Sequence, residues 1–255
     1  MESKDMELLK TEEKSENKKP KKKEKKKKKE KLTFTLTKKG KHISYFTNLL
    51  RVLIIPIFFL LSPFKYYGAK KIKDGSLIYV CNHYTMVDAL YIAATTWEGV
   101  HYMAKRENFE IPVIGWGLRK IKGISVNRDG SDVRGVLDSL KCLKAGEKIA
   151  IFPEGTRNRL GNDELLPFYH GAAMIAIKTK TPILPMVIYK KPRLFRTTHI
   201  LLGEPFELTE YYDKKLTPEE AVKADDEIRA AMIALRQKHK EYLEAKKNAK
   251  RNKKA

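Results

Sequence analysis

Residues 148–157 read KIAIFPEGTR, an apolar stretch that runs directly into a turn containing proline and glycine. Its first half, Lys148–Phe152, is apolar enough to form a strand in the centre of a sheet. The turn leaves that strand at its carboxyl end, which is where open α/β sheets bind their ligands. The stretch therefore predicts a buried sheet with a binding site at one edge.

Strand-like and helix-like periodicities alternate on both sides of this stretch, which predicts an α/β fold: a single domain with a mostly parallel or mixed central sheet flanked by helices. The further strands that we expect are Ser76–Cys81, Val100–Ala104, Gly123–Asn127, Ile183–Tyr189 and Thr197–Gly203. The helices expected between them are Val87–Thr95, Phe109–Lys120 and Val133–Lys144. Thr217-Pro218-Glu219-Glu220 predicts the start of a C-terminal helix, with Thr217 and Glu220 forming a capping box.

The net charge of +22 is unevenly distributed. Residues 1–31 hold 14 Lys against 8 acidic residues, and residues 238–255 hold 8 Lys and Arg against 2 Glu. We interpret residues 1–40 as a disordered Lys-rich tail, 71–240 as the α/β domain and 241–255 as a basic C-terminal tail. Such basicity favours an anionic membrane lipid surface or nucleic acid as partner, and the apolar segment after the first tail favours lipid, so nucleic acid is not expected.

That apolar segment, Leu49–Phe64, has an uncharged run of 13 residues from Val52 to Phe64, whereas a helix needs roughly 20 to cross a bilayer. Pro56 interrupts the run, and aromatic and basic residues flank it. We expect residues 41–70 to form a membrane-interfacial helical segment, which would make the protein monotopic or peripheral on the cytoplasmic face. A buried core helix and a true membrane span are the alternatives.

His83 and Asp88 follow the predicted strand Ser76–Cys81. In one continuous helix an offset of five residues would turn their side chains about 140° apart. The two can meet only if His83 lies in the turn before the helix and Asp88 in its first turn, a geometry that the spacing Thr85-x-x-Asp88 supports. Asp88 could then orient His83 as a general base. Alternatively, Asp88 is only a capping residue and His83 only a loop histidine.

Cations follow several predicted strand ends: Lys105 and Arg106, Arg128, and Arg157. In the turn, Gly155 would allow close approach of the backbone, Thr156 offers a hydroxyl and Arg157 a fork suited to phosphate. A turn with surface charges, including a Glu154–Arg157 ion pair, is the alternative. The two cysteines, Cys81 and Cys142, are too few and too far apart to predict a disulfide framework or a metal cluster. No Gly-x-Ser-x-Gly sequence is present, so a covalent intermediate has no clear nucleophile.

At these residues the chain resembles the 1-acyl-sn-glycerol-3-phosphate (lysophosphatidic acid) acyltransferase family. His83-x4-Asp88 is similar to its His-x4-Asp motif, Gly123–Arg128 to its second motif, Phe152–Arg157 to Phe-Pro-Glu-Gly-Thr-Arg, and Thr181–Ile188 to a proline-centred fourth motif. The resemblance implies an enzyme that moves an acyl group from acyl-CoA or acyl carrier protein to the sn-2 hydroxyl of lysophosphatidic acid, giving phosphatidic acid for phospholipid biosynthesis.

By the same resemblance His83 is the catalytic base and Asp88 orients it. The acceptor phosphate is bound by Arg128, Glu154, Gly155, Thr156 and Arg157, with Lys105 as a further contact, and backbone N–H groups near Gly155 face the oxyanion. No metal and no cofactor beyond the acyl donor are implied.

Two departures concern the acceptor: Ser125 stands where the family often has an aromatic residue, and Tyr169 where many members have Lys. A family enzyme that acts on glycerol 3-phosphate or a lysophospholipid is therefore an alternative. A non-catalytic basic membrane-binding protein is a second one.

Overall fold

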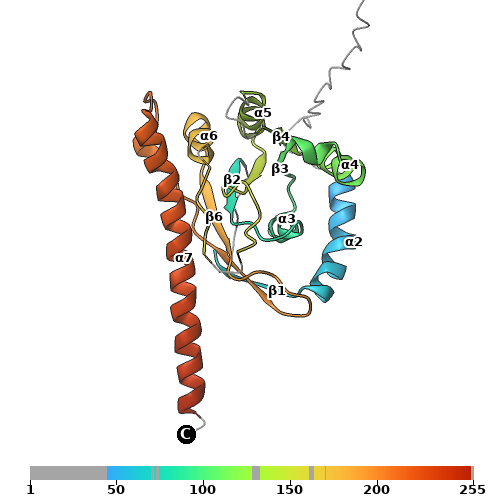
Figure 1. Ribbon diagram of the computed structural model, residues 1–255, viewed down its shortest axis with the longest axis vertical. Helices are drawn as coiled ribbons and strands as arrows, with labels where there is room; N and C mark the ends of the chain where they lie inside the picture. The colour runs from blue at the N-terminus through green and yellow to red at the C-terminus, as the bar shows by residue number, and fades with distance from the viewer. Residues whose placement is uncertain are drawn as a thin grey trace, which may run out of the picture. The chain divides into compact units, whose positions relative to one another are not determined.

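The computed structural model describes residues 45–69, 72, 75–127, 133–160, 164–169 and 171–253. The predicted Lys-rich tail, residues 1–40, lies outside this part of the chain. The described residues form an α/β fold around one seven-stranded mixed sheet, as the sequence predicts (Figure 1). The strands are β1 (Phe64–Gly68), β2 (Leu77–Cys81), β3 (Val100–Lys105), β4 (Ile124–Val126), β5 (Lys148–Ile151), β6 (Ile183–Ile188) and β7 (Thr198–Leu202).

The strand order is β1-β7-β6-β2-β5-β3-β4, and only the β6–β7 pair is antiparallel. The strands β2, β5 and β6 are buried along their whole length, which explains their continuous apolar sequences. Because β6, β2, β5, β3 and β4 run in the same direction, their carboxyl ends lie along one edge of the sheet. The segments that follow these ends are the ones in which the sequence places its functional residues.

The helices cover both faces of the sheet. They are α2 (Tyr45–Leu61), α3 (Asp88–Ala93), α4 (Pro112–Lys120), α5 (Val133–Lys144), α6 (Ala172–Thr179) and α7 (Pro218–Asn252), with short 3₁₀ turns η1 (Arg106–Phe109) and η2 (Thr209–Tyr211). Helix α6 packs between α5 and α7 (Figure 1). Helix α3 contacts α2 through Tyr91, whose ring lies 5.1 Å from that of Phe58.

The segment predicted as helical over residues 41–70 divides into a helix and a strand. Helix α2 ends at Leu61, and Phe64–Gly68 forms β1, the edge strand beside β7. Pro63 explains the change, because proline disfavours helical backbone in the residue before it and cannot continue a helix. The prediction of a single helical segment is therefore wrong for its last part.

Helix α2 has one packed side and one exposed side. Phe58 is buried against Tyr91 and Phe64. The opposite side exposes large apolar side chains: Leu49, Val52, Leu53, Ile57 and Leu60. No helix in the described part of the chain is both long and apolar enough to cross a membrane.

The last helix, α7, begins with the predicted capping box. Thr217 accepts a hydrogen bond from the backbone N–H of Glu220, and the Glu220 carboxylate accepts one from the N–H of Thr217. The helix continues to Asn252, so the residues from 241 onward, predicted as a tail that follows the domain, extend α7 as far as the structure describes them.

Candidate active site

His83 and Asp88 meet as the capping geometry predicts. His83 lies in the turn after β2, Asp88 begins α3, and the Nδ1 atom of His83 lies 2.8 Å from Oδ2 of Asp88. Asp88 is fully buried, and its carboxylate also accepts hydrogen bonds from the backbone N–H groups of Tyr84 and Thr85 and from the Thr85 hydroxyl. The predicted capping box is only half formed, because the Thr85 hydroxyl donates to Asp88 instead of accepting its N–H.

These four contacts fix the tautomer of His83. A carboxylate can only accept hydrogen bonds, so the Nδ1 atom that faces Asp88 carries the proton. The Nε2 atom is then the unprotonated nitrogen, and His83 lines a cavity. Asp88 therefore both holds the backbone turn and orients the imidazole, so the two sequence interpretations of this residue are compatible.

Three residues that the sequence did not single out for this role hold the loop of His83 in place. The ring of Phe152 stacks on the imidazole, with centroids 4.3 Å apart. The backbone N–H of Asn158 donates to the carbonyl oxygen of His83 at 2.7 Å. Asn82 exchanges two hydrogen bonds with the backbone of Ile188, at 3.1 and 2.8 Å. The loop is thus tied to the turn after β5 and to the end of β6.

The turn Phe152–Arg157 is tight and depends on Gly155. The N–H of Gly155 donates to the carbonyl oxygen of Phe152 at 3.0 Å, and its φ of +61° lies in the left-handed region. A Cβ atom at this position would lie 2.6 Å from the ring of Tyr169. Because the Gly155 N–H is already used inside the turn, it is not free to bind an oxyanion, and the prediction of oxyanion donors near Gly155 rests on other N–H groups.

Glu154 does not line the cavity that contains His83 and Gly155. Its side chain is buried, and burial raises the pKa of its carboxyl to about 7, with the nearby Asp88 charge adding to the effect. The backbone N–H groups of His83 and Leu166 favour the charged form, although neither makes a hydrogen bond of good geometry with Glu154. This placement does not support contact of the Glu154 carboxyl with a phosphate. It favours a role in holding the turn Phe152–Arg157 in place.

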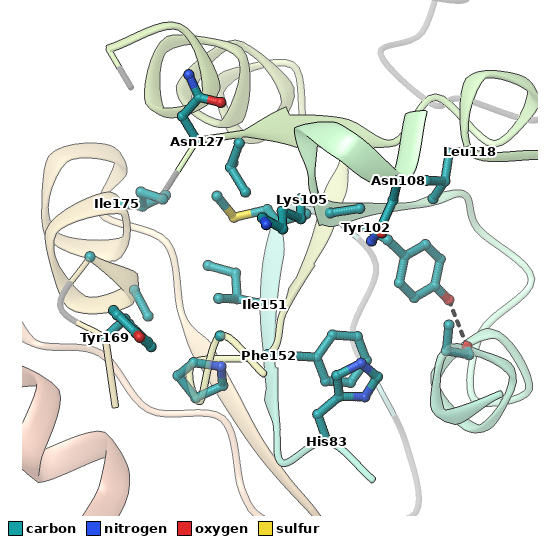
Figure 2. Close-up of a pocket in the computed structure, with 18 of the residues that line it drawn as sticks. His83, Tyr102, Lys105, Asn108, Leu118, Asn127, Ile151, Phe152, Tyr169 and Ile175 are labelled. Carbon is teal, nitrogen blue, oxygen red and sulfur yellow. Dashed lines mark hydrogen bonds between the residues drawn. The ribbon is translucent and has the colours of Figure 1, made fainter. Parts of the chain in front are cut away.

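The cavity next to His83 has a volume of about 440 Å³. His83 and Phe152 lie at one end of it and Asn127 at the other, with Lys105 between them (Figure 2). Its wall is mostly apolar and includes Met103, Ile114, Leu118, Ile121, Val126, Val136, Ile151 and Ile175. Such a cavity suits a hydrocarbon chain whose reacting end reaches His83.

The predicted phosphate-binding residues divide into three groups. Gly155 and Lys105 line the cavity, and Lys105 is its one Lys or Arg among the described residues. Thr156 is exposed and Arg157 half-buried, and neither lines the cavity. Arg128, which follows Asn127 in the sequence, lies outside the described residues. The Lys105 ammonium lies 2.8 Å from the carboxylate of Glu107, so an anion bound there would compete with Glu107.

Neither cysteine is suited to act as a nucleophile. Burial raises the pKa of the fully buried Cys81 thiol well above its usual range. Burial likewise raises the pKa of Cys142 to about 12. Both groups are therefore protonated thiols at neutral pH.

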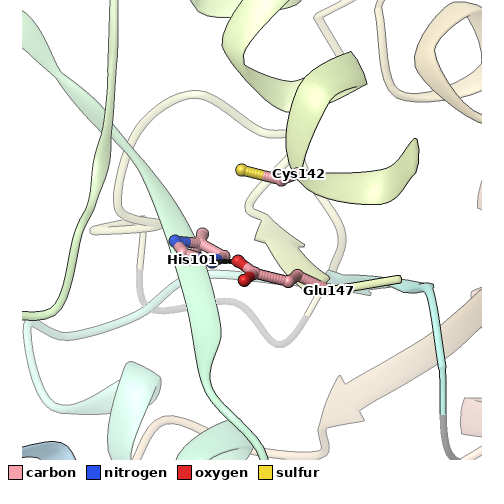
Figure 3. Close-up of side chains that lie close together, drawn as sticks. All are labelled: His101, Cys142 and Glu147. Carbon is pink, nitrogen blue, oxygen red and sulfur yellow. Dashed lines mark hydrogen bonds and ion pairs between the residues drawn. The ribbon is translucent and has the colours of Figure 1, made fainter. Parts of the chain in front are cut away.

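One set of side chains in the described residues could supply several metal ligands: His101, Cys142 and Glu147 (Figure 3). All three are buried, and their ligand atoms lie within 4.8 Å of one another. The Nε2 atom of His101 contacts the Glu147 carboxylate and its Nδ1 atom the carbonyl oxygen of Lys122. A carbonyl oxygen only accepts hydrogen bonds, so the Nδ1 atom of His101 donates to it. None of the three lines the cavity.

Comparisons with known proteins agree with this geometry. Residues 63–189 match the family model described as Acyltransferase. The chain is 32% identical over 145 residues to the 1-acyl-sn-glycerol-3-phosphate acyltransferase of Bacillus subtilis, covering 54% of this chain and 70% of that one. It is 34% identical over 127 residues to the enzyme of the same name from Helicobacter pylori, covering 48% of this chain and 52% of that one. The chain thus spans about half the length of the latter.

The fold also has a solved counterpart. The crystal structure of the 1-acyl-sn-glycerophosphate (LPA) acyltransferase PlsC from Thermotoga maritima superposes with a TM-score of 0.56 at 25% identity, over 76% of this chain and 79% of that one. The matched family segment, residues 63–189, contains His83, Asp88 and the turn Phe152–Arg157. The chain therefore belongs to the 1-acyl-sn-glycerol-3-phosphate acyltransferase family.

Proposed function

We propose that this protein transfers a fatty acyl group from an acyl thioester to the sn-2 hydroxyl of 1-acyl-glycerol 3-phosphate. The observation that carries the proposal is the His83–Asp88 pair at the end of an apolar cavity. Asp88 holds the proton on Nδ1, which leaves Nε2 as a base toward the cavity. The two curated relatives named above carry the same activity in their names, which supports this choice of reaction.

The reaction needs no covalent enzyme intermediate. His83 Nε2 takes the proton of the acceptor hydroxyl while the hydroxyl oxygen attacks the carbonyl carbon of the thioester. The resulting tetrahedral oxyanion then breaks its C–S bond, and the departing thiolate takes the proton back from the imidazolium. The Asp88 carboxylate stabilises the imidazolium while it exists. The donor, in this proposal, is acyl-CoA or acyl carrier protein.

The acceptor phosphate binds, in this proposal, to three cations that come after strands in the sequence: Lys105, Arg128 and Arg157. Lys105 lies at the cavity itself, and the other two follow β4 and β5. A cationic set of this kind distinguishes a phosphate-bearing acceptor from a neutral one by charge. Glycerol 3-phosphate and lysophospholipids with larger headgroups are the competing acceptors.

The site of action, in this proposal, is the cytoplasmic surface of a membrane, with the protein bound peripherally. Support comes from α2, whose outward side presents Leu49, Val52, Leu53, Ile57 and Leu60 to solvent. An exposed apolar helix face of this kind is stable at the boundary between headgroups and acyl chains. An anionic lipid surface would also attract a chain with a net charge of +22.

The decisive experiment follows thiol release from an acyl thioester by the purified protein in lipid micelles with 1-acyl-glycerol 3-phosphate. We expect turnover in the wild type and none above background in His83→Ala, while the circular dichroism spectra of the two proteins agree. A Cys81→Ser variant is the control, because this thiol has no role in the reaction. Equal turnover in His83→Ala would exclude the mechanism, and a folded wild type without turnover would favour the non-catalytic alternative.

A panel of acceptors separates the competing substrates. Glycerol 3-phosphate, lysophosphatidylcholine and monoacylglycerol are compared with 1-acyl-glycerol 3-phosphate at matched concentrations. We expect Lys105→Ala to raise KM for the phosphate-bearing acceptor more than it lowers kcat, since Lys105 binds the phosphate and not the reacting atoms. Equal kcat/KM for monoacylglycerol would exclude the phosphate-binding part of the proposal.

A further inference from the structure

The loop between β6 and β7 has an apolar tip surrounded by positive charge. Leu194 and Phe195 are 68% and 71% exposed. The exposed side chains next to them in the loop are Lys190, Lys191, Arg193 and Arg196. Two large apolar side chains held in water among four cations have the composition of a surface that binds an anionic lipid layer.

Phe195 occupies a backbone conformation that aromatic residues rarely adopt. Its φ is +58°, in the left-handed region, where glycine or asparagine would lie with less strain. A bulky residue at this position costs stability, and the exposed ring recovers little of that cost by packing within the described part of the chain. Strained residues of this kind concentrate at functional sites. The phenyl ring is therefore better explained by a contact outside the protein.

The loop tip lies beside the end of α2. The N–H of Phe195 donates to the carbonyl oxygen of Leu61 at 2.8 Å, and the N–H of Thr198 donates to that of Pro63 at 2.7 Å. In Figure 1 this loop, orange and between β6 and β7, reaches the same end of α2. The last turns of α2 expose Ile57 and Leu60, at 61% and 74%. The exposed apolar side of α2 therefore continues into the loop.

We propose that Leu194 and Phe195 form a second membrane contact, in which both side chains enter the headgroup boundary of an anionic bilayer while the neighbouring cations bind lipid phosphates. This inference rests on the peripheral membrane binding proposed above. A single helix lying on a membrane leaves the attached domain free to roll about the helix axis. A second contact beside its end removes that freedom.

The topology indicates what this orientation achieves. Strand β6 runs parallel to β2, so the loop that follows Ile188 leaves the sheet at the edge where His83 follows Cys81. Asn82 bonds directly to Ile188, which joins the base of this loop to the loop of the catalytic histidine. Insertion of the loop tip thus brings the active-site edge toward the membrane that holds the lipid acceptor.

The test compares the full-length wild type with Leu194→Ser/Phe195→Asn in sedimentation with vesicles of phosphatidylcholine and phosphatidylglycerol. We expect the variant to bind at least about tenfold more weakly, because two apolar side chains leave the lipid. Its melting temperature should stay the same or rise, since asparagine accepts a positive φ. Ile233→Ser is the control, as Ile233 is a partly exposed apolar residue of α7 and should leave vesicle binding unchanged.

A second variant separates charge from apolar insertion. Lys191→Gln/Arg193→Gln/Arg196→Gln should weaken binding to the anionic vesicles and leave binding to pure phosphatidylcholine vesicles unchanged. Turnover of a short-chain acceptor dissolved as monomers should be normal in both variants. This measurement tests the proposed acyl transfer separately from membrane binding. Wild-type vesicle binding in the Leu194→Ser/Phe195→Asn variant overturns the inference. A change in sedimentation coefficient without vesicles would also overturn it, as it would assign the tip to a protein contact.

Discussion

The backbone N–H of Asn158 donates to the carbonyl oxygen of His83, with 2.7 Å between the two atoms. This bond joins the turn after β5 to the loop after β2, so the two segments hold each other in place. Asn158 itself is buried and is held by its side chain, which donates to the carbonyl oxygen of Glu164 at 2.8 Å and accepts from the N–H of Leu160 at 3.0 Å.

Replacing Asn158 should therefore affect catalysis without touching the substrate. Asn158→Ala leaves two partners without their hydrogen bonds, at a cost of about 1–3 kcal/mol for a group that stays buried. We expect a lower melting temperature and a kcat reduced about tenfold with little change in KM, because the loop of His83 is less well held. Leu160→Ala is the control, since it keeps the backbone N–H. A variant with unchanged kcat would show that this bond does not position His83.

The second prediction concerns the tautomer of His83. Asp88→Asn keeps the shape of the side chain but replaces an oxygen that accepts from His83, Tyr84 and Thr85. If the amide NH₂ faces His83, the imidazole must accept at Nδ1 and carry its proton on Nε2, where it cannot act as the base. We expect turnover to fall by roughly 10³–10⁴.

Thiol release measured under saturating donor and acceptor would check this outcome. Thr85→Ser is the matched control, because it keeps the hydroxyl that donates to Asp88. It should retain most of the activity. A loss in Asp88→Asn that is no larger than the loss in Thr85→Ser would mean that Asp88 serves mainly as a capping residue.

The third prediction concerns the left-handed turn at Gly155. A methyl group at this position meets the ring of Tyr169 at 2.6 Å and also strains a φ of +61°. We expect Gly155→Ala to destabilise the protein by more than about 1 kcal/mol, as alanine does where φ is positive. It should also lower kcat/KM, since Tyr169 lines the cavity and has to move.

Gly117→Ala provides the comparison. Gly117 lies in α4, and no atom lies within 4 Å of a Cβ added there. Alanine in an open helix position should stabilise by about 0.5–1 kcal/mol. Urea unfolding of both variants would measure the difference. If Gly155→Ala were as stable as the wild type, the turn would have to tolerate a side chain that this geometry excludes.

The sequence predicts the alternation of strands and helices well, because buried parallel strands such as β5 and β6 are continuous apolar runs. It fails at β1 and α6. The strand Phe64–Gly68 directly follows the apolar run of α2, and periodicity does not mark where helix changes to strand. Helix α6, Ala172–Thr179, is buried on most sides and so lacks the polar face that reveals an amphipathic helix.

The candidate site is predictable to the extent that its geometry is local. If His83 lies in a turn before a helix, its five-residue spacing from Asp88 brings the two side chains into contact. Lys105 and Gly155 follow the carboxyl ends of parallel strands, which lie at the same edge of the sheet. Contacts between distant segments are not local. The packing of Tyr169 on Gly155, the bond from Asn158 to His83 and the burial of Glu154 all depend on how the chain after β5 folds back.

The fourth prediction concerns pH and Glu154. Its pKa is raised from 4.5 to about 7 by burial, so between these values the unfolded chain is ionised while the folded protein keeps the proton. The unfolded state then binds fewer protons, and stability falls as pH rises from about 4.5 to 7. The full effect is on the order of 3 kcal/mol. Urea unfolding of Glu154→Gln at pH 5 and pH 8 should lack this fall, and an identical pH dependence in wild type and variant would contradict it.

The last prediction concerns a histidine pair where α7 meets β7. The Nδ1 atom of His199 lies 2.8 Å from Nε2 of His239, so one ring donates and the other accepts. Burial lowers the pKa of His239 to about 4, and the neighbouring His199 adds to the effect. Burial and the cations Lys65 and Lys246 lower the pKa of His199. A further proton would therefore have to enter a site that disfavours positive charge.

The direction of this effect is opposite to that of Glu154. Between about pH 6.5 and 4 the histidines are protonated in the unfolded chain but not in the folded protein. The free energy of unfolding therefore falls as pH decreases. In His239→Leu that loss should be smaller, so acidification from pH 7 to pH 5 should lower the melting temperature less, or raise it more, than in the wild type. Because the two trends oppose each other and partly cancel in the wild type, the Glu154 trend is clearer in His239→Leu and the histidine trend is clearer in Glu154→Gln. In the double variant His239→Leu/Glu154→Gln the Glu154 trend should disappear and the histidine trend should be as small as in His239→Leu, since the two sites lie on different elements and their effects should add. A steeper acid loss in His239→Leu than in the wild type would show that protonation of the histidine pair does not cause the loss of stability.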